Sequence, residues 1–385
     1  MGRKRPSHAD GGACAARCAQ RRGATDMSEV PLLPPWLAAP LAQGLSLQAH
    51  ALLLHGPGGV GQFELGLALA TGWLCEASNG RQRPCGQCAG CRLMAAHMHP
   101  DFHLLLPDDL REALGWDAAE EGTEGDGVAK SSKTKAKPSK EIRVEAVRSA
   151  IEWGQRTSSR GGAKVILIHP AQAMNSIAAN ALLKTLEEPA GRLRLVLTAH
   201  DPEALLATVR SRCQRLRIEL PATAQALAWL ASQGIARPEV LIAAAGGQPL
   251  DALAMAADGI DSQAWERVPE AVHRGLAAPV ISWPLARLID ALQKLCHDLM
   301  CLRAEAAPRY FSATTLAPLM QPRGPQWPAL AQWACDLTQA ARHDEHPWHA
   351  GLRTEALVGQ GARLWQTPRS QTAAAGGQLD TLGAR

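Results

Sequence analysis

Apolar residues follow two different periods along this chain, and the change of period predicts where strands alternate with helices. Near-continuous apolar runs occupy residues 51–54, 102–106, 164–168, 193–198 and 216–220. Such runs are typical of strands that are buried on both faces. Helical spacing separates them, most clearly at 176–188, where the apolar positions fall at i, i+3, i+4 and i+7 and Pro189 ends the pattern. This alternation predicts an α/β domain with a five-stranded parallel sheet.

The strand pattern ends at Pro221, and the remainder is rich in Ala, Leu and Trp at helical spacing. Eight acidic residues within 108–126 are followed by five lysines within 130–140, with no periodic apolar face, so we expect 108–140 to be a flexible surface insertion. The domains that we predict are a disordered leader or an over-long gene start, the α/β domain, a small helical domain, a larger helical domain and a disordered tail, at 1–26, 27–220, 221–264, 265–366 and 367–385.

The net positive charge of this chain comes from its first 26 residues. The net charge is +4, and the leader alone carries six Lys/Arg against two Asp, which leaves 34 residues of each sign elsewhere. A broad basic surface for nucleic acid is therefore not expected in the folded part, and any DNA contact is expected to be shared with partners. No apolar run approaches the ~18 to 20 residues of a membrane span. Ten cysteines without an export signal favour a reducing compartment, the cytoplasm.

The segment between the first strand and the next helix, residues 55–63, has the layout of a phosphate-binding loop. Gly56 and Gly61 have the spacing of such a loop, in which a Lys contacts the phosphates and a Ser or Thr holds Mg²⁺. Gln62 stands at the Lys position and Phe63 at the Ser/Thr position. An amide and an aromatic ring supply neither a cation nor a metal ligand, so the loop predicts a nucleotide-binding scaffold without its chemistry.

Four cysteines close in sequence predict a metal site. Cys85, Cys88 and Cys91 are spaced by two residues, and Cys75 lies ten residues upstream. Zn²⁺ takes four ligands in a tetrahedron, and four thiolates leave no open position, so we expect a structural zinc. His97 and His99 are alternative ligands for one position, and a redox-active pair or an iron–sulfur cluster are rival interpretations. The remaining cysteines (Cys14, Cys18, Cys213, Cys296, Cys301, Cys335) are scattered.

Several stretches together give the chain its resemblance to a known family. The most specific is Asn180-Ala-Leu-Leu-Lys-Thr-Leu-Glu-Glu-Pro189, and residues 205–213 end in Ser211-Arg212-Cys213. With the loop that lacks Lys and the cysteine cluster, these residues resemble the AAA+ superfamily, and within it the delta-prime family of the bacterial DNA polymerase III clamp loader. The match is dense over 50–220 and thinner beyond. The resemblance implies an AAA+ domain at 27–220, a helical lid at 221–264 and a helical collar at 265–366.

Five parts that the ATP-hydrolysing members use are replaced in this chain. Besides the Lys and the Ser/Thr, the Asp-Glu pair expected after the third strand is replaced by His169-Pro170, and Leu250 stands where those members carry a sensing Arg. Phosphoryl transfer requires these charges. The resemblance therefore implies a subunit with no productive ATP binding and no ATPase or polymerase activity of its own, although it would be part of a DNA-directed DNA polymerase holoenzyme.

Arg212 is retained, and in the family an Arg at this motif acts as an arginine finger in a neighbour's ATP site. The resemblance implies a stator in a five-membered ring with gamma/tau-type ATPase subunits and the delta subunit, which loads the sliding clamp onto primer–template DNA. Two alternatives remain at this point. The chain is an ATP-hydrolysing motor subunit of the same complex, which ATP binding would reveal, or a zinc-finger module that binds nucleic acid. The neutral charge outside the leader counts against the second.

Overall fold

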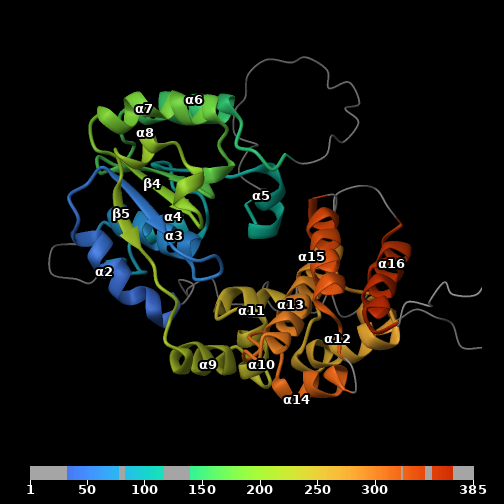
Figure 1. The fold of residues 1–385 in the computed structure, drawn as a ribbon. Helices are drawn as coiled ribbons and strands as arrows, with labels where there is room; N and C mark the ends of the chain where they lie inside the picture. Colours follow the sequence, from blue (N-terminus) through green and yellow to red (C-terminus); the bar gives the residue numbers. More distant parts are fainter. Residues whose placement is uncertain (1–32, 78–82, 117–138, 322–323, 343–348, 367–385) are drawn as a thin grey trace, which may run out of the picture. The chain divides into compact units, whose positions relative to one another are not determined.

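The computed structural model describes residues 33–77, 83–116, 139–321, 324–342 and 349–366 (Figure 1). The chain divides into two compact units. The first, which we call the α/β unit, comprises Met1–Ile235 and Gly247–Leu253. The second, the helical unit, comprises Ala236–Gly246 and Ala254–Arg385. Each unit is described by itself.

The α/β unit contains the five-stranded parallel sheet that the apolar runs predict. Its order is β2-β3-β4-β1-β5, and every neighbouring pair is parallel. The strands are β1 (Ala51–His55), β2 (Phe102–Leu105), β3 (Lys164–Ile168), β4 (Leu193–Ala199) and β5 (Gln214–Arg217). Since the strands are parallel, their carboxyl ends share one edge of the sheet and their amino ends share the other.

The prediction for the last strand, 216–220, is displaced by two residues at its start and by three at its end. β5 begins at Gln214, and its pattern is exposed except at Leu216, because it lies at the edge of the sheet. Leu220 is 43% exposed and lies beyond the strand. An apolar run therefore marks the neighbourhood of this edge strand but not its register.

Helices cover both faces of the sheet (Figure 1). On one face, alternate strand residues such as Leu53 and Ile166 pack with α6, α7 and α8. On the other, Leu52 and Val165 pack with α2, α3 and α4. Asn175 caps α7 by accepting a hydrogen bond from the Ala178 N–H. The helices of the unit are η1 (Pro35–Leu37), α2 (Ala38–Ser46), α3 (Gln62–Trp73), α4 (Ala89–Ala95), α5 (Asp108–Leu114), α6 (Val144–Gln155), η3 (Ala171–Ala173), α7 (Ser176–Glu187), η4 (Pro202–Ala204), α8 (Ala207–Arg210) and α9 (Thr223–Ser232).

The stretch predicted as a flexible insertion, 108–140, begins with a helix, so that prediction is wrong for its first residues. Asp108–Leu114 forms α5. Trp116 after it is buried and stacks on His97 at 3.7 Å between ring centroids, which fixes the end of this segment to the domain. Residues 117–138 of the predicted insertion lie outside the described residues, as do the predicted leader 1–26 and the tail 367–385.

The helical unit is all-helical in its described part, as the spacing after Pro221 predicts. α13 packs against α15, and α12 packs against α16. Its elements are α10 (Pro238–Ala244), α12 (Ser262–Arg274), η5 (Ala278–Val280), α13 (Leu285–Arg303), α14 (Ala313–Leu316), η6 (Ala317–Met320), α15 (Trp327–Arg342), α16 (Ala350–Ala362) and η7 (Arg363–Trp365), and α11 (Pro249–Ala257) crosses the boundary between the units.

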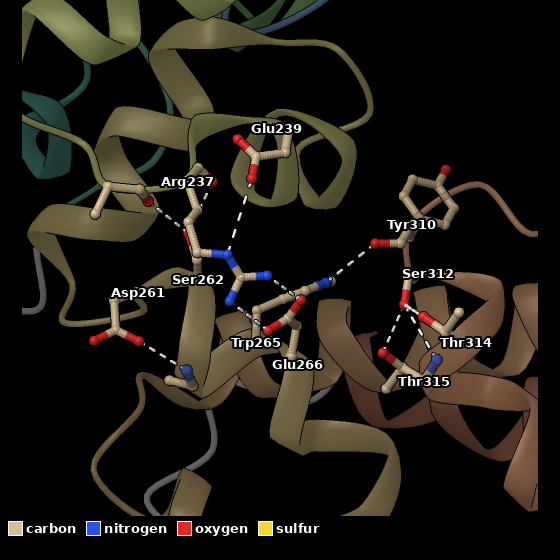
Figure 2. A network of polar contacts seen from close by, with 12 residues as sticks. Arg237, Glu239, Asp261, Ser262, Trp265, Glu266, Tyr310, Ser312, Thr314 and Thr315 are labelled. Atoms are coloured by element: carbon tan, nitrogen blue, oxygen red, sulfur yellow. Dashed lines mark hydrogen bonds and ion pairs between the residues drawn. The ribbon is translucent and has the colours of Figure 1, made fainter.

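Polar contacts at the start of α12 join the chain segments of the helical unit (Figure 2). Ser262 donates to the carbonyls of Ala236 and Arg237, and the Arg237 guanidinium is paired with the Glu266 carboxylate. The indole of Trp265, which is fully buried, donates to the Tyr310 carbonyl at 3.1 Å. These bonds hold α10, α12 and the loop before α14 as one body.

In the described ranges, no single helix is both long and apolar enough to cross a membrane, although one bent pair of short helices, Pro238–Ala244 and Pro249–Ala257, meets the same criterion by length and composition.

Candidate functional site

The loop that resembles a phosphate-binding loop lies at the carboxyl edge of the sheet, between β1 and α3. Gly59 and Gly61 adopt positive φ angles of 61° and 104°, which glycine tolerates best. At Gly56 a Cβ atom would lie 2.1 Å from the Ile218 carbonyl oxygen, so this glycine is required by close packing. The glycines thus serve the backbone path of the loop, whether or not a ligand is bound.

The interior of the loop is occupied by the side chain of Gln62. Its side chain is buried, and its Nε2 donates to the carbonyls of Gly56, at 2.9 Å, and of Pro57. In addition, the Leu250 N–H donates to the Gly59 carbonyl at 3.0 Å. The loop is therefore held by hydrogen bonds within the protein, in the region where a nucleotide-binding loop would hold phosphates.

Neutral side chains occupy the neighbouring positions where the acidic pair and the metal ligand are expected. The Phe63 ring lies 4.7 Å from the His169 ring. His169 Nδ1 and the Thr198 hydroxyl are hydrogen-bonded at 2.7 Å. Burial lowers the pKa of His169 to about 4, with a smaller contribution from His200, so the imidazole is neutral near pH 7. The sequence identified Phe63 and His169 as replacements but gave no sign that they contact each other or Thr198.

The four cysteines predicted as metal ligands lie together in the segment that runs from the end of α3 to the first turn of α4. Their four Sγ atoms lie within 4.8 Å of one another. The Cys85–Cys91 and Cys75–Cys88 Sγ pairs are each 3.9 Å apart. A tetrahedron with Zn–S bonds of ~2.3 Å has edges of about 3.8 Å, so the set fits a zinc ion.

Backbone N–H groups point at these sulfurs, as at sites that hold thiolates. The N–H groups of Glu76, Cys88 and Cys91 lie 3.4 Å from Sγ atoms of the cluster. The N–H groups of Gln87 and Cys88 lower the pKa of the Cys85 thiol to about 6. A Cβ on Gly90 would lie 2.4 Å from the Leu74 carbonyl oxygen, so glycine is required for α4 to approach the end of α3. The cluster can hold a metal ion.

The two histidines considered as alternative ligands have other contacts. His97 stacks on Trp116, and His99 Nδ1 accepts a hydrogen bond from the Asp101 N–H at 3.1 Å. Among the described residues, the metal-ligand set at this place consists of the four cysteines.

Arg212 lies in the turn between α8 and β5, and its side chain is one-third exposed. Its Nε donates to the Glu187 carboxylate at 2.6 Å, and its Nη1 donates to the Thr208 carbonyl at 2.9 Å. Glu187 is the last residue of α7, within the 180–189 stretch. The guanidinium is thus held in one place at the surface, by a partner that sequence reasoning did not identify. The available signal was an acidic residue at the end of the helix that carries the 180–189 stretch.

Comparisons with known proteins agree with the resemblance found in the sequence. The model of the family described as "DNA polymerase III, delta subunit" matches residues 42–222. DNA polymerase III subunit delta' of Pseudomonas aeruginosa is 37% identical over 276 residues, which cover 69% of this chain and 74% of the relative. The subunit delta' of Escherichia coli is 32% identical over 263 residues (64% and 70%). DNA polymerase III subunit tau of Salmonella typhimurium is 33% identical over 181 residues (46% and 23%).

Proposed function

The chain belongs to the family of DNA polymerase III delta-prime subunits, and from this premise we propose that it is a non-hydrolysing subunit of the replicative clamp loader that donates Arg212 to a neighbouring ATP site. It would act as a stator in a ring with gamma/tau-type ATPase subunits and a delta subunit, while the ring loads the sliding clamp onto primed DNA. The similarity to a tau subunit supports partners of that type.

The non-hydrolysing part of the proposal rests on the loop at residues 55–63, which we call the closed loop because its own hydrogen bonds fill its interior. Gln62 donates to the loop's own carbonyls, and Phe63 packs on a neutral His169. Within residues 55–63 there is no Lys or Arg to balance the charge of a triphosphate. Electrostatic stabilisation of phosphoryl transfer needs cations and a metal ion at this place, so the energy for loading would come from the partners' sites.

The geometry of Arg212 supports its role as a donor in trans. The Glu187 carboxylate pairs with both Nε and Nη2, and the Thr208 carbonyl accepts from Nη1; together they orient the guanidinium, and the Arg212 side chain stays partly exposed. A planar, oriented guanidinium is the group that contacts phosphate oxygens in two places. Arginine fingers accelerate phosphoryl transfer by roughly 10³ to 10⁵ in well-studied GTPases.

The cysteine cluster completes the proposal as a structural zinc site. Four ligands of the cluster close the coordination sphere and leave no position for a reacting molecule. The zinc would hold the end of α3 against α4. It would thereby stabilise the helices that cover this face of the sheet.

The experiment that tests this function is Arg212→Ala in the reconstituted complex. Folding and assembly should be nearly unchanged, because an ion pair between side chains 33% and 50% exposed contributes about 0.2–1 kcal/mol at most. The DNA- and clamp-stimulated ATPase should fall but persist, since the other ATPase sites do not depend on this residue.

Three further variants test whether Arg212 acts through the shape of its guanidinium or only through its positive charge. Arg212→Lys should be nearly as harmful, because an ammonium lacks the fork. Glu187→Gln should have a smaller effect, since an amide oxygen can still accept from Nε. Arg217→Ala, an exposed arginine outside the motif, is the control and should change little. A complex with Arg212→Ala that loads clamps at the normal rate would leave this chain a stator without a role in hydrolysis.

A further inference from the structure

Three helices that cover one face of the sheet, α2, α3 and α4, border a cavity of about 910 Å³ within the α/β unit. The lining residues of α2 and of α3 recur at helical spacing, so each of these helices presents one stripe of side chains to the cavity. The two stripes are Ala38, Leu41, Ala42 and Leu45 on α2, and Glu64, Leu67, Ala68 and Thr71 on α3. Met94 of α4 and Trp116 complete the apolar wall. Nothing in the proposed clamp-loader function uses this cavity.

The cavity exists because small side chains stand where larger ones would fill the space between the helices. Ala42 and Ala68 line it, and Leu41 and Leu67 beside them remain partly exposed. In contrast, Leu65 on the side of α3 that packs on the sheet is fully buried. Apolar surface that is left in contact with water favours an apolar ligand that displaces this water. The volume lies within the range of about 300–1,000 Å³ that is usual for small-molecule sites.

One acidic side chain, that of Glu64 in the first turn of α3, lies among these apolar residues. Burial raises the pKa of Glu64, its own backbone N–H lowers it by a smaller amount, and no basic side chain of the described ranges contributes. The residue is partly buried, and its oxygens are not among the enclosed atoms that lack a hydrogen-bond partner, so a ligand in the cavity can reach them. The carboxylate therefore lacks a cation, and the cavity gives a cation access to it.

The other charged groups of the lining do not supply this cation. The exposed Arg83 side chain donates from Nη2 to the Ala77 carbonyl at 2.7 Å, which is outside the lining. Partial burial lowers the pKa of His97, so its imidazole is neutral near pH 7. Cys91 also lines the cavity, and four thiolates on one Zn²⁺ carry a net negative charge. With the proposed zinc bound, the wall is negative in sum and favours a positively charged ligand.

We propose that this cavity binds an aliphatic amine, a small molecule with an apolar chain and one ammonium group. The chain would lie against the apolar stripes of α2 and α3 and against Trp116, and the ammonium would pair with the Glu64 carboxylate. An alkyl ammonium, like that of lysine, stays charged near pH 7. Its hydrogen bonds to a carboxylate are roughly twice as strong as those between neutral groups. A neutral molecule of the same size would leave the carboxylate without a partner, and an anionic one would be repelled.

The test is calorimetric titration of the full chain, with zinc bound, with octylamine, octanol and octanoate, which share one chain length and differ in their head group. Octylamine should bind saturably and at least about fivefold more tightly than octanol, which is the upper value for an exposed ion pair. Octanoate should bind most weakly. Glu64→Gln should remove the difference between octylamine and octanol and leave octanol binding unchanged. Glu145→Gln is the matched control, because it removes an exposed acid from the first turn of α6, outside the lining.

A second variant tests where the amine binds. Ala42 is exposed on α2, so Ala42→Trp places a ring in the cavity without displacing a core residue, and circular dichroism verifies the fold. Octylamine and octanol should then no longer bind saturably. The proposal is overturned by absent saturable octylamine binding, by equal binding of octylamine and octanol to the unmodified chain, by tightest binding of octanoate, or by unchanged binding in Ala42→Trp. Arg212 is not among the lining residues, so Arg212→Ala should leave amine binding unchanged and failure of one proposal does not bear on the other.

Discussion

Replacing Gln62 with methionine tests whether the loop is closed by its own side chain. Methionine has a similar length but no N–H donor, so the carbonyls of Gly56 and Pro57 lose their partner. An unsatisfied buried acceptor costs about 1–3 kcal/mol, and these two carbonyls share one amide. Because both residues are only partly buried and water can replace some of the bonding, we expect the free energy of unfolding to fall by about 1–2 kcal/mol.

Urea unfolding of the variant, followed by circular dichroism, measures this loss. The matched control is Gln225→Met, on the exposed face of α9, which should change stability by less than about 0.5 kcal/mol. The same preparation is titrated with ATP and Mg²⁺, and neither the unmodified chain nor Gln62→Met should bind measurably. Equal stability of Gln62→Met and the unmodified chain would show that the amide does not hold the loop. Micromolar ATP affinity of the unmodified chain would refute the closed-loop interpretation altogether.

The remaining predictions concern the neighbouring chemistry. Gln62→Lys combined with Phe63→Thr should not produce ATPase activity, measured as phosphate release, because the neutral His169 still stands where an acidic pair is required. Freshly reduced protein should contain about one zinc per chain by metal analysis, and reduced protein without zinc would contradict the prediction. Cys88→Ser should lower both the zinc content and the thermal stability, because the free energy of metal binding at such sites also stabilises the fold. Stability should fall as the pH falls from 7 to 5, because the pKa of His169 is about 4 when folded and 6.5 when unfolded, so that the unfolded chain binds the proton first. This difference corresponds to about 2 kcal/mol at pH 5, and it should be absent in His169→Gln; an unchanged pH dependence of the variant would show that His169 does not carry it.

The extent to which sequence predicted this fold follows from how local each signal is. The runs at 164–168 and 193–198 predicted β3 and β4 to within a residue, because central strands of a parallel sheet are apolar on both faces. β5 was displaced, because an edge strand needs one apolar position only. α5 was missed because its support is Trp116, whose contact with His97 depends on a different part of the chain.

The same distinction holds for the candidate sites. Spacing alone predicted that Cys75, Cys85, Cys88 and Cys91 would meet, because a tight turn and one helical turn bring them together with little help from the rest of the fold. Composition alone showed that Gln62 and Phe63 lack the charge and the hydroxyl of a nucleotide site. These are statements about which chemical groups are present, and a sequence determines them completely.

Only the tertiary structure decided what those groups contact. Glu187 is 25 residues from Arg212 along the chain. Glu187 ends α7 and Arg212 lies in the turn before β5, and no periodic pattern in the sequence relates these two places. The amide of Gln62 inside its own loop, and the contact of the Phe63 ring with the His169 ring, arise from strands that meet at a common edge. Sequence patterns report the environment of each residue along its own element, whereas hydrogen bonds and charge pairs between distant elements are fixed by the packing of the whole sheet.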